Sequence, residues 1–170
     1  MSEHGESKKS SAVVVGVDGS AGSNEALRWA LAEARLRKGR LRALHSWIYV
    51  HTLVPPLVGY PSAGEMIEPA LADAAADAEQ AAETILKRAI AELGEVDDVE
   101  VERVIVQGSP AQALIDAVSE QDLLVVGSRG HGGFANLLLG SVSQQCAQHA
   151  PCPVVIVRGA NGSNAPEGVS

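Results

Sequence analysis

The sequence predicts an α/β fold, a Rossmann-like open doubly wound sheet of five parallel strands with four helices distributed over both faces. Short apolar runs alternate along the chain with segments of helical periodicity. Apolar residues make up 46% of the chain but aromatic residues only 3%, so the core must be aliphatic, which suits a helix-covered parallel sheet. Glycine-containing turns follow the first and fourth apolar runs, where ligands bind in such sheets.

Composition sets the domain limits and excludes several classes of partner. Residues 1–10 and 159–170 are polar and rich in Gly, Ser and Asn, and are predicted to be disordered tails, which leaves 11–158 as a single domain. A net charge of −8 without a basic stripe disfavours nucleic acid as a partner. No apolar run approaches the length of a membrane span, and no apolar leader is visible near Met1, so no membrane partner and a cytoplasmic location are expected.

The start of the domain is predicted to form a strand followed by a helix. Val13–Val17 is continuously apolar, which indicates a strand buried on both faces. After a turn at Asp18–Ser20, apolar residues recur at helical spacing, and either Ser20 or Ser23 is predicted to cap that helix. Arg40–Trp47 is the second predicted strand.

The middle of the chain combines a loop, a long helix and a strand. Residues 50–66 contain three prolines and are predicted to form an apolar loop, either a lid over a ligand or a subunit contact. Pro69–Leu93 is alanine-rich with an apolar stripe, and Gly94 ends this predicted helix. Val99–Val106 is the third strand.

The third helix is predicted to begin with Ser109 as N-cap and Pro110 at its first position. Residues 123–126 form the fourth strand. A capping box, Ser141 with Gln144 three residues later, predicts the start of a short fourth helix.

The last predicted strand, Pro153–Val157, ends the ordered part of the chain and is expected at an edge of the sheet. An exposed apolar edge strand promotes aggregation, and pairing with its own copy about a two-fold axis removes that exposure. The sequence therefore predicts a homodimer formed through Val154–Val157.

The segment from Gly127 to Ser143 has the ingredients of a phosphate cradle, although the dinucleotide and P-loop fingerprints are absent. Its glycines let the backbone approach a ligand, and it leads into a helix whose first N–H groups lack internal partners. The side chains that add donors are Arg129, His131, Ser141 and Ser143. From these residues alone, phosphate binding and a plain flexible connector are equally well supported.

The spacing within this segment is more specific. Gly127, Gly130, Gly140 and Ser141 fit the pattern G-x2-G-x9-G-S, and the flanking segments read GVDGS at 16–20, GSPAQALI at 108–115 and PCPVVIVR at 151–158. In these features the chain resembles the ATP-binding branch of the universal stress protein family. The resemblance covers about residues 11–158.

This resemblance implies an adenine-nucleotide-binding protein that acts as a nucleotide-dependent sensor or switch in the stress response, with an unidentified protein client. The ligand would be ATP, or ADP or AMP, together with Mg²⁺. Asp18 matches an acidic residue near the ribose and adenine, whereas Val17 and the His45–Ser46 segment match positions that line the adenine. The residues that match phosphate contacts are Gly127, Gly130, Gly140, Ser141 and Val142. Two departures from the family, Ser46 in place of an aliphatic residue and Gly16 in place of Pro or Ala, bear on how tightly the adenine packs.

Three other interpretations compete with this one. A nucleotide hydrolase or adenylating enzyme on the same fold would carry S-G-G-x-D-S after the first strand, and residues 18–23 lack its double glycine. No nucleophile–base pair stands out, so no catalytic residue is assigned and at most a slow ATPase is expected. A pure interaction module would not need the glycine spacing. A metal site at Cys146, His149 and Cys152 lacks a second ligand cluster, so no metal ligand is assigned.

Overall fold

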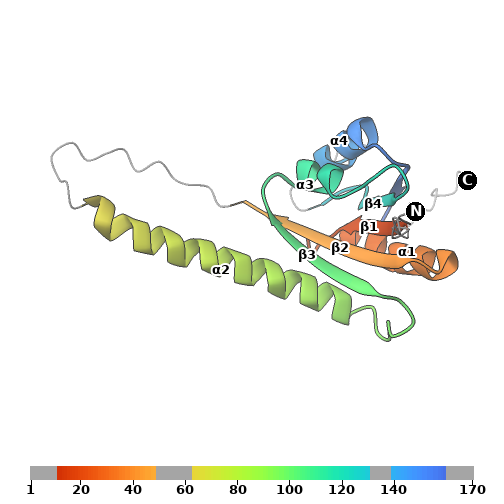
Figure 1. Cartoon of the computed structure of the whole chain (residues 1–170), viewed down its shortest axis with the longest axis horizontal. Helices are drawn as coiled ribbons and strands as arrows, with labels where there is room; N and C mark the ends of the chain where they lie inside the picture. The colour runs from red at the N-terminus through yellow and green to blue at the C-terminus, as the bar shows by residue number, and fades with distance from the viewer. Residues whose placement is uncertain (1–10, 49–62, 131–138, 160–170) are drawn as a thin grey trace, which may run out of the picture.

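The computed structural model describes residues 11–48, 63–130 and 139–159, with side chains described from residue 71 onward in the second of these ranges. Within them a five-stranded parallel sheet has the strand order β3-β2-β1-β4-β5 (Figure 1). The predicted fold is thus confirmed, and β5 lies at a sheet edge as expected. The strands are β1 (Ala12–Gly16), β2 (Arg40–Trp47), β3 (Val101–Gln107), β4 (Leu123–Gly127) and β5 (Val154–Val157).

Two layers of helices cover the sheet, because successive side chains of a strand point to opposite faces. In β1, Val13 and Val15 pack with the helices α1 and α2, whereas Val14 packs with α3 and α4 on the other face. All three valines are at most 1% exposed, as the continuous apolar run predicted. The described helices are α1 (Ala21–Arg37), α2 (Ala63–Ala91), α3 (Pro110–Asp116) and α4 (Ser141–His149).

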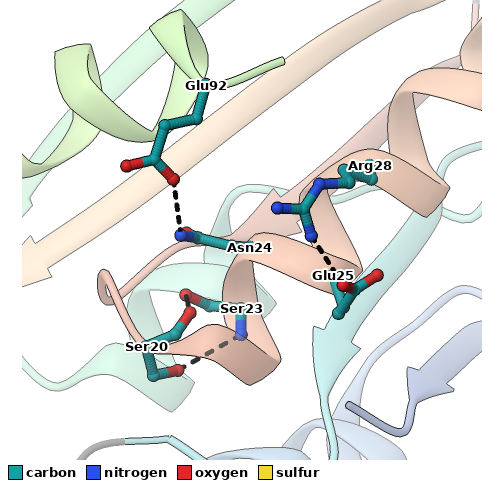
Figure 2. Close-up of polar contacts among 6 residues, drawn as sticks. All are labelled: Ser20, Ser23, Asn24, Glu25, Arg28 and Glu92. Atoms are coloured by element: carbon teal, nitrogen blue, oxygen red, sulfur yellow. Dashed lines mark hydrogen bonds and ion pairs between the residues drawn. The ribbon is translucent and has the colours of Figure 1, made fainter. Parts of the chain in front are cut away.

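The start of α1 decides between the two predicted caps in favour of Ser20. The Ser20 hydroxyl accepts a hydrogen bond from the Ser23 backbone N–H at 3.2 Å, which satisfies one of the unpaired donors of the first turn. Figure 2 shows this cap and, one residue later, the Asn24 amide donating to the Glu92 carboxylate at 3.1 Å. This contact ties the beginning of α1 to the segment that follows α2.

Helix α2 begins earlier than predicted. It starts at Ala63 rather than Pro69, so residues 63–66 of the predicted loop are helical, and the rest of that loop lies outside the described residues. The prediction was wrong because Pro69 was placed at the first turn. A proline inside a helix removes one N–H donor, and the backbone here remains helical across it. The N-terminal part of α2 extends beyond the sheet in Figure 1.

The predicted capping box of α4 is also wrong. Gly140, not Ser141, occupies the N-cap with extended dihedrals, φ −68° and ψ 157°, and its carbonyl accepts from the Gln144 N–H at 3.0 Å. Ser141 is consequently the first helical residue. Elsewhere the structure agrees more closely, since Ser109 is the N-cap of α3 with Pro110 next, and Gly94 after α2 has a φ of +80°.

No helix in the described ranges is long and apolar enough to span a membrane.

Candidate functional site

A cavity of about 560 Å³ opens at the carboxyl ends of β1 and β4. These strands are neighbours in the middle of the sheet, and the strand order runs away from them in opposite directions, toward β3 on one side and β5 on the other. Such a reversal leaves a crevice between the two following loops, which is where ligands bind in open α/β sheets. The volume falls within the usual range of small-molecule sites.

The residues predicted to bind the ligand that fall within the described part of the chain all lie on the wall of this one cavity. They come from the β1–α1 turn, the end of β2, the loop after β4 and the first turn of α4. The ten predicted residues are Val17, Asp18, Ser46, Gly127, Arg129, Gly130, Gly140, Ser141, Val142 and Ser143. The structure brings them together, and their contact with a ligand stays a prediction.

The same wall includes residues that the sequence did not single out as site residues: Ser23, Leu44, Pro110, Leu114 and Val126. Pro110 and Leu114 stand four residues apart on α3, and so share one face of it. The segment 108–115 was noticed only for its family resemblance. Its helical spacing was the available signal that Leu114 would face the same way as Pro110.

The β1–α1 turn is held by a set of short-range hydrogen bonds. The Asp18 N–H donates to Ser23 Oγ at 3.2 Å, and the Ser20 N–H donates to Asp18 Oδ1 at 2.9 Å. Ser23 Oγ in turn donates to the Ser20 carbonyl at 3.0 Å. The carboxylate of Asp18 is therefore part of the turn as well as of the cavity wall, and its position is set by the backbone around it.

The two ends of the glycine-rich loop are fastened to each other and to the sheet. The Gly140 N–H donates to the Ser128 carbonyl, and the Ser128 N–H donates to the Val157 carbonyl, each at 2.7 Å. Ser143 Oγ donates to the Gly127 carbonyl at 2.5 Å. A hydroxyl has one hydrogen, so this bond uses the hydrogen that was expected to reach a phosphate, and Ser143 instead holds β4 against α4.

Close packing explains why glycine is needed at Gly127, where the neighbour is backbone, and shows that a side chain at Gly130 would displace the Asp18 carboxylate. A Cβ on Gly127 would come within 2.9 Å of the Gly22 carbonyl carbon and oxygen, and one on Gly130 would overlap Asp18 Oδ2. Gly140 is different, because a Cβ there would meet its neighbours at 3.5 Å, an ordinary contact. With φ at −68°, neither the backbone nor the packing of the described residues requires glycine at 140.

At Gly16, one of the two positions where the sequence departs from the family pattern, the wall of the cavity is closely packed. A Cβ on Gly16 would lie 2.9 Å from Leu114 Cδ1, so the Leu114 side chain already occupies the space that a larger residue would take. Leu114 is 2% exposed and lines the cavity. The effect of Gly16 on the packing of an adenine stays a prediction.

Few charged or titratable side chains lie on the described part of the wall. They are Asp18 and Arg129, from the two opposing loops, and His45 at the end of β2. His131, which was considered with them, lies outside the described residues.

The two cysteines lie away from the cavity wall and are free thiols. Cys146 is fully buried, and burial, assisted by the nearby Cys152, raises the pKa of the Cys146 thiol to about 11. Such a group behaves as a small apolar side chain at neutral pH. Among the described residues, no three His, Cys, Asp or Glu side chains are grouped so that they hold a metal ion.

Comparison with known proteins gives a consistent result. The model of the universal stress protein family matches residues 10–158. Universal stress protein Rv2623 of Mycobacterium tuberculosis is 37% identical over 146 residues, which cover 86% of this chain and 44% of that protein. The universal stress protein of Thermus aquaticus described as lying in a QAH/OAS sulfhydrylase 3′ region is 32% identical over 148 residues, covering 86% of this chain and 97% of that protein.

The solved structures agree in fold. Universal stress protein UspA from Lactobacillus plantarum superposes with a TM-score of 0.70 at 21% identity, covering 88% of this chain and 99% of that one. A universal stress protein in complex with cAMP has a TM-score of 0.58 at 27% identity, covering 89% and 98%. The present chain spans less than half the length of the mycobacterial relative.

Proposed function

Because the chain belongs to the universal stress protein family, we propose that its cavity binds an adenine nucleotide, with ATP and Mg²⁺ as the primary ligand. ADP and AMP are the alternatives. The observation that carries the proposal is that one cavity combines an apolar wall with a backbone cradle at a helix N-terminus. The similar structure that holds cAMP supports the adenine nucleotide class.

The apolar part of the wall suits a purine base. Val17 and Leu44 approach from the middle of the sheet, and Leu114 from α3, and all three are at most 3% exposed. Ser46 adds a hydroxyl to this part of the wall. Asp18 lies at the end of β1, where a carboxylate is placed to accept hydrogen bonds from ribose hydroxyls or the base.

The opposite part of the wall suits phosphate. The N–H groups of Ser141, Val142 and Ser143 belong to the first turn of α4 and so lack partners within the helix. Together with the positive end of the helix dipole they form a local anion site, which outweighs the chain's net charge of −8 over short range. Arg129 adds a cation.

The proposed Mg²⁺ would accompany the phosphates of ATP. This ion binds through one or two carboxylates plus phosphate oxygens and keeps several waters. Asp18 is the carboxylate on the described part of the wall, so the donor set fits an ion held mainly by the nucleotide.

We place the protein among binding proteins rather than enzymes, with at most a slow ATPase. Of the titratable groups on the described wall, Asp18 Oδ1 accepts from a backbone N–H, and His45 Nδ1 is bonded to a backbone carbonyl. Arginine does not act as a base at neutral pH. These arrangements offer no evident group to activate water for attack on a phosphate.

The proposed role is that of a nucleotide-dependent sensor or switch in the stress response, in which the bound state alters recognition of a client protein. Its proposed setting is the cytoplasm, where free cysteines such as Cys146 and Cys152 stay reduced. The proposed oligomer is a homodimer through β5.

Titration calorimetry with ATP, ADP, AMP and cAMP, with and without Mg²⁺, tests the proposal. Gly140→Leu places a side chain in the phosphate part of the cavity, at a position where the fold tolerates a Cβ, and is expected to abolish binding while circular dichroism stays unchanged. Ala32→Leu adds comparable volume to the exposed face of α1 and is expected to bind normally. Absence of binding of all four nucleotides by the wild type would contradict the proposal.

A further inference from the structure

His45 is the buried histidine of the described residues, 8% exposed near the end of β2. Strand alternation places it on the same face as Leu41 and Ala43, which pack against α1 and α2, whereas Leu44 belongs to the cluster on the opposite face. The imidazole thus belongs to the α1 and α2 side of the sheet, although His45 is also among the residues that line the cavity.

The ring has a defined hydrogen bond. His45 Nδ1 lies 2.6 Å from the Val17 carbonyl oxygen in a buried environment. Since a carbonyl oxygen only accepts, the ring donates through Nδ1–H. β1 ends at Gly16, and the Val17 N–H still donates to the Leu44 carbonyl at 2.8 Å. The His45 side chain therefore continues the pairing between β1 and β2 by one further bond, and a buried carbonyl is satisfied.

This bond acts on the residue that follows. The Val17 carbonyl and the Asp18 N–H belong to the same planar peptide unit, so fixing one end of the unit orients the other. His45 holds the carbonyl end, and Ser23 Oγ accepts from the N–H end at 3.2 Å. The peptide that precedes the Asp18 side chain is thereby held from both sides.

We infer that His45 is a positioning residue for Asp18: its Nδ1–H bond to the Val17 carbonyl fixes the turn that presents the Asp18 carboxylate to the nucleotide. The inference rests on the proposed nucleotide function for its binding consequence, but the positioning itself exists without ligand. This positioning role of His45 differs from the predicted role of Ser46, which also lines the cavity but is predicted to contact the adenine.

Two substitutions test the hydrogen bond, one that keeps a donor at this place and one that removes it. His45→Asn carries its amide group at the position of Nδ1 and can still donate to the Val17 carbonyl, whereas His45→Leu has similar bulk and no donor. His149→Leu, at an exposed histidine of α4, is the matched control. His45→Gln, whose amide group lies at the position of Nε2, replaces the leucine variant if that variant does not fold.

The first measurement uses ligand-free protein. We expect amide hydrogen exchange at Asp18, followed by NMR, to accelerate about tenfold or more in His45→Leu and to stay near wild type in His45→Asn and His149→Leu. Equal exchange in His45→Leu and wild type would overturn the inference whether or not a nucleotide binds.

The second measurement is a double-mutant cycle on ATP affinity. His45→Leu should weaken binding by roughly tenfold in the wild-type background, which corresponds to loss of one oriented contact. In an Asp18→Ala background it should change the affinity little, because its effect passes through Asp18. A loss of the same size in both backgrounds would overturn the inference while leaving nucleotide binding intact. Absence of ATP binding by the wild type would instead overturn the proposed function, and the exchange experiment would still decide the positioning role.

Discussion

At the scale of single residues, the glycines around the cavity serve different purposes. The backbones of Gly127 and Gly22 lie so close together that a Cβ on Gly127 would come within 2.9 Å of the Gly22 carbonyl group. Gly140 meets no such obstacle, although its place in the G-x2-G-x9-G-S pattern is equally regular. The structure therefore separates a glycine that the fold requires from one whose lack of a side chain leaves room in the cavity.

Alanine substitutions are expected to reveal this difference. Gly127→Ala should lower the free energy of unfolding by about 1–3 kcal/mol, because backbone atoms of α1 must shift to admit the methyl group. Gly140→Ala should lower it by less, about 0.5–1 kcal/mol, which is the ordinary preference for glycine over alanine at an N-cap. Urea denaturation of the two variants and the wild type measures both values. Comparable destabilisation by the two substitutions would contradict this reading of the packing.

A second residue-scale feature is the anchoring of β1 by Asp122. Oδ1 accepts from the Ala12 N–H at 2.7 Å, and Oδ2 accepts from the Ser119 N–H and hydroxyl at 2.8 and 2.7 Å. Burial alone would raise the pKa of this carboxyl, but these donors, with Arg42 nearby, outweigh burial and hold the pKa below its usual value. The ionised form is therefore favoured in the folded state.

This anchoring predicts a pH dependence of stability. A depressed pKa contributes stability above the unfolded value, about 3.9, and the contribution is lost as the pH falls through the lower folded value. Asp122→Asn places an amide donor against one of the N–H groups and should cost about 1 kcal/mol or more at pH 7. The difference from wild type should shrink as the pH falls below about 4. Denaturation across that range measures it, with the exposed Asp97→Asn as control; a difference independent of pH would refute the assignment.

At the scale of elements, the sequence located all five strands of the described residues. β1 and β4 are apolar runs buried on both faces, which makes them easy to predict, whereas β2 and β3 also carry charged residues. Helix starts were harder to predict. Ser141 followed by Gln144 has the form of a capping box, but Gly140 occupies the cap position and makes no side-chain hydrogen bond there. The local pattern did not indicate that the helix begins one residue earlier, with its first N–H groups left without partners in the helix.

The residues that line the cavity were likewise only partly predictable from local sequence patterns. Its loop residues were predictable because the glycine spacing is local in sequence, whereas Leu114 and His45 act through contacts with distant residues. Leu114 packs on Gly16, nearly a hundred positions away, and His45 is bonded to Val17 across two strands. Such pairings depend on strand order and register, which single-sequence periodicity does not provide.

At the scale of the whole molecule, the outer edge of β5, which has no partner strand among the described residues, predicts the assembly. The Pro153 and Val157 carbonyls are bonded to β4, so by alternation the backbone groups of Val154 and Ile156 point outward from the sheet. Pairing of these groups with a second copy would extend the sheet across a two-fold axis. We expect a homodimer at concentrations of about tens of micromolar.

Val154→Pro tests this assembly without adding charge. An edge strand tolerates proline where its N–H faces outward, so the monomer should keep its fold, but one intermolecular donor is lost. Light scattering is expected to show a dimer for the wild type and for Val154→Thr, and a monomer for Val154→Pro. A monomeric wild type would refute the prediction.

The wall of the cavity draws on two separate stretches of the chain, one ending at Ser46 and the next beginning at Pro110. No described residue between them lines the cavity, although that interval contains all of α2 and β3. Substitutions on the exposed surface of the described part of this interval therefore leave the composition of the ligand wall unchanged, so the outer surface of α2 and β3 can differ in charge or shape without altering the residues that face a ligand.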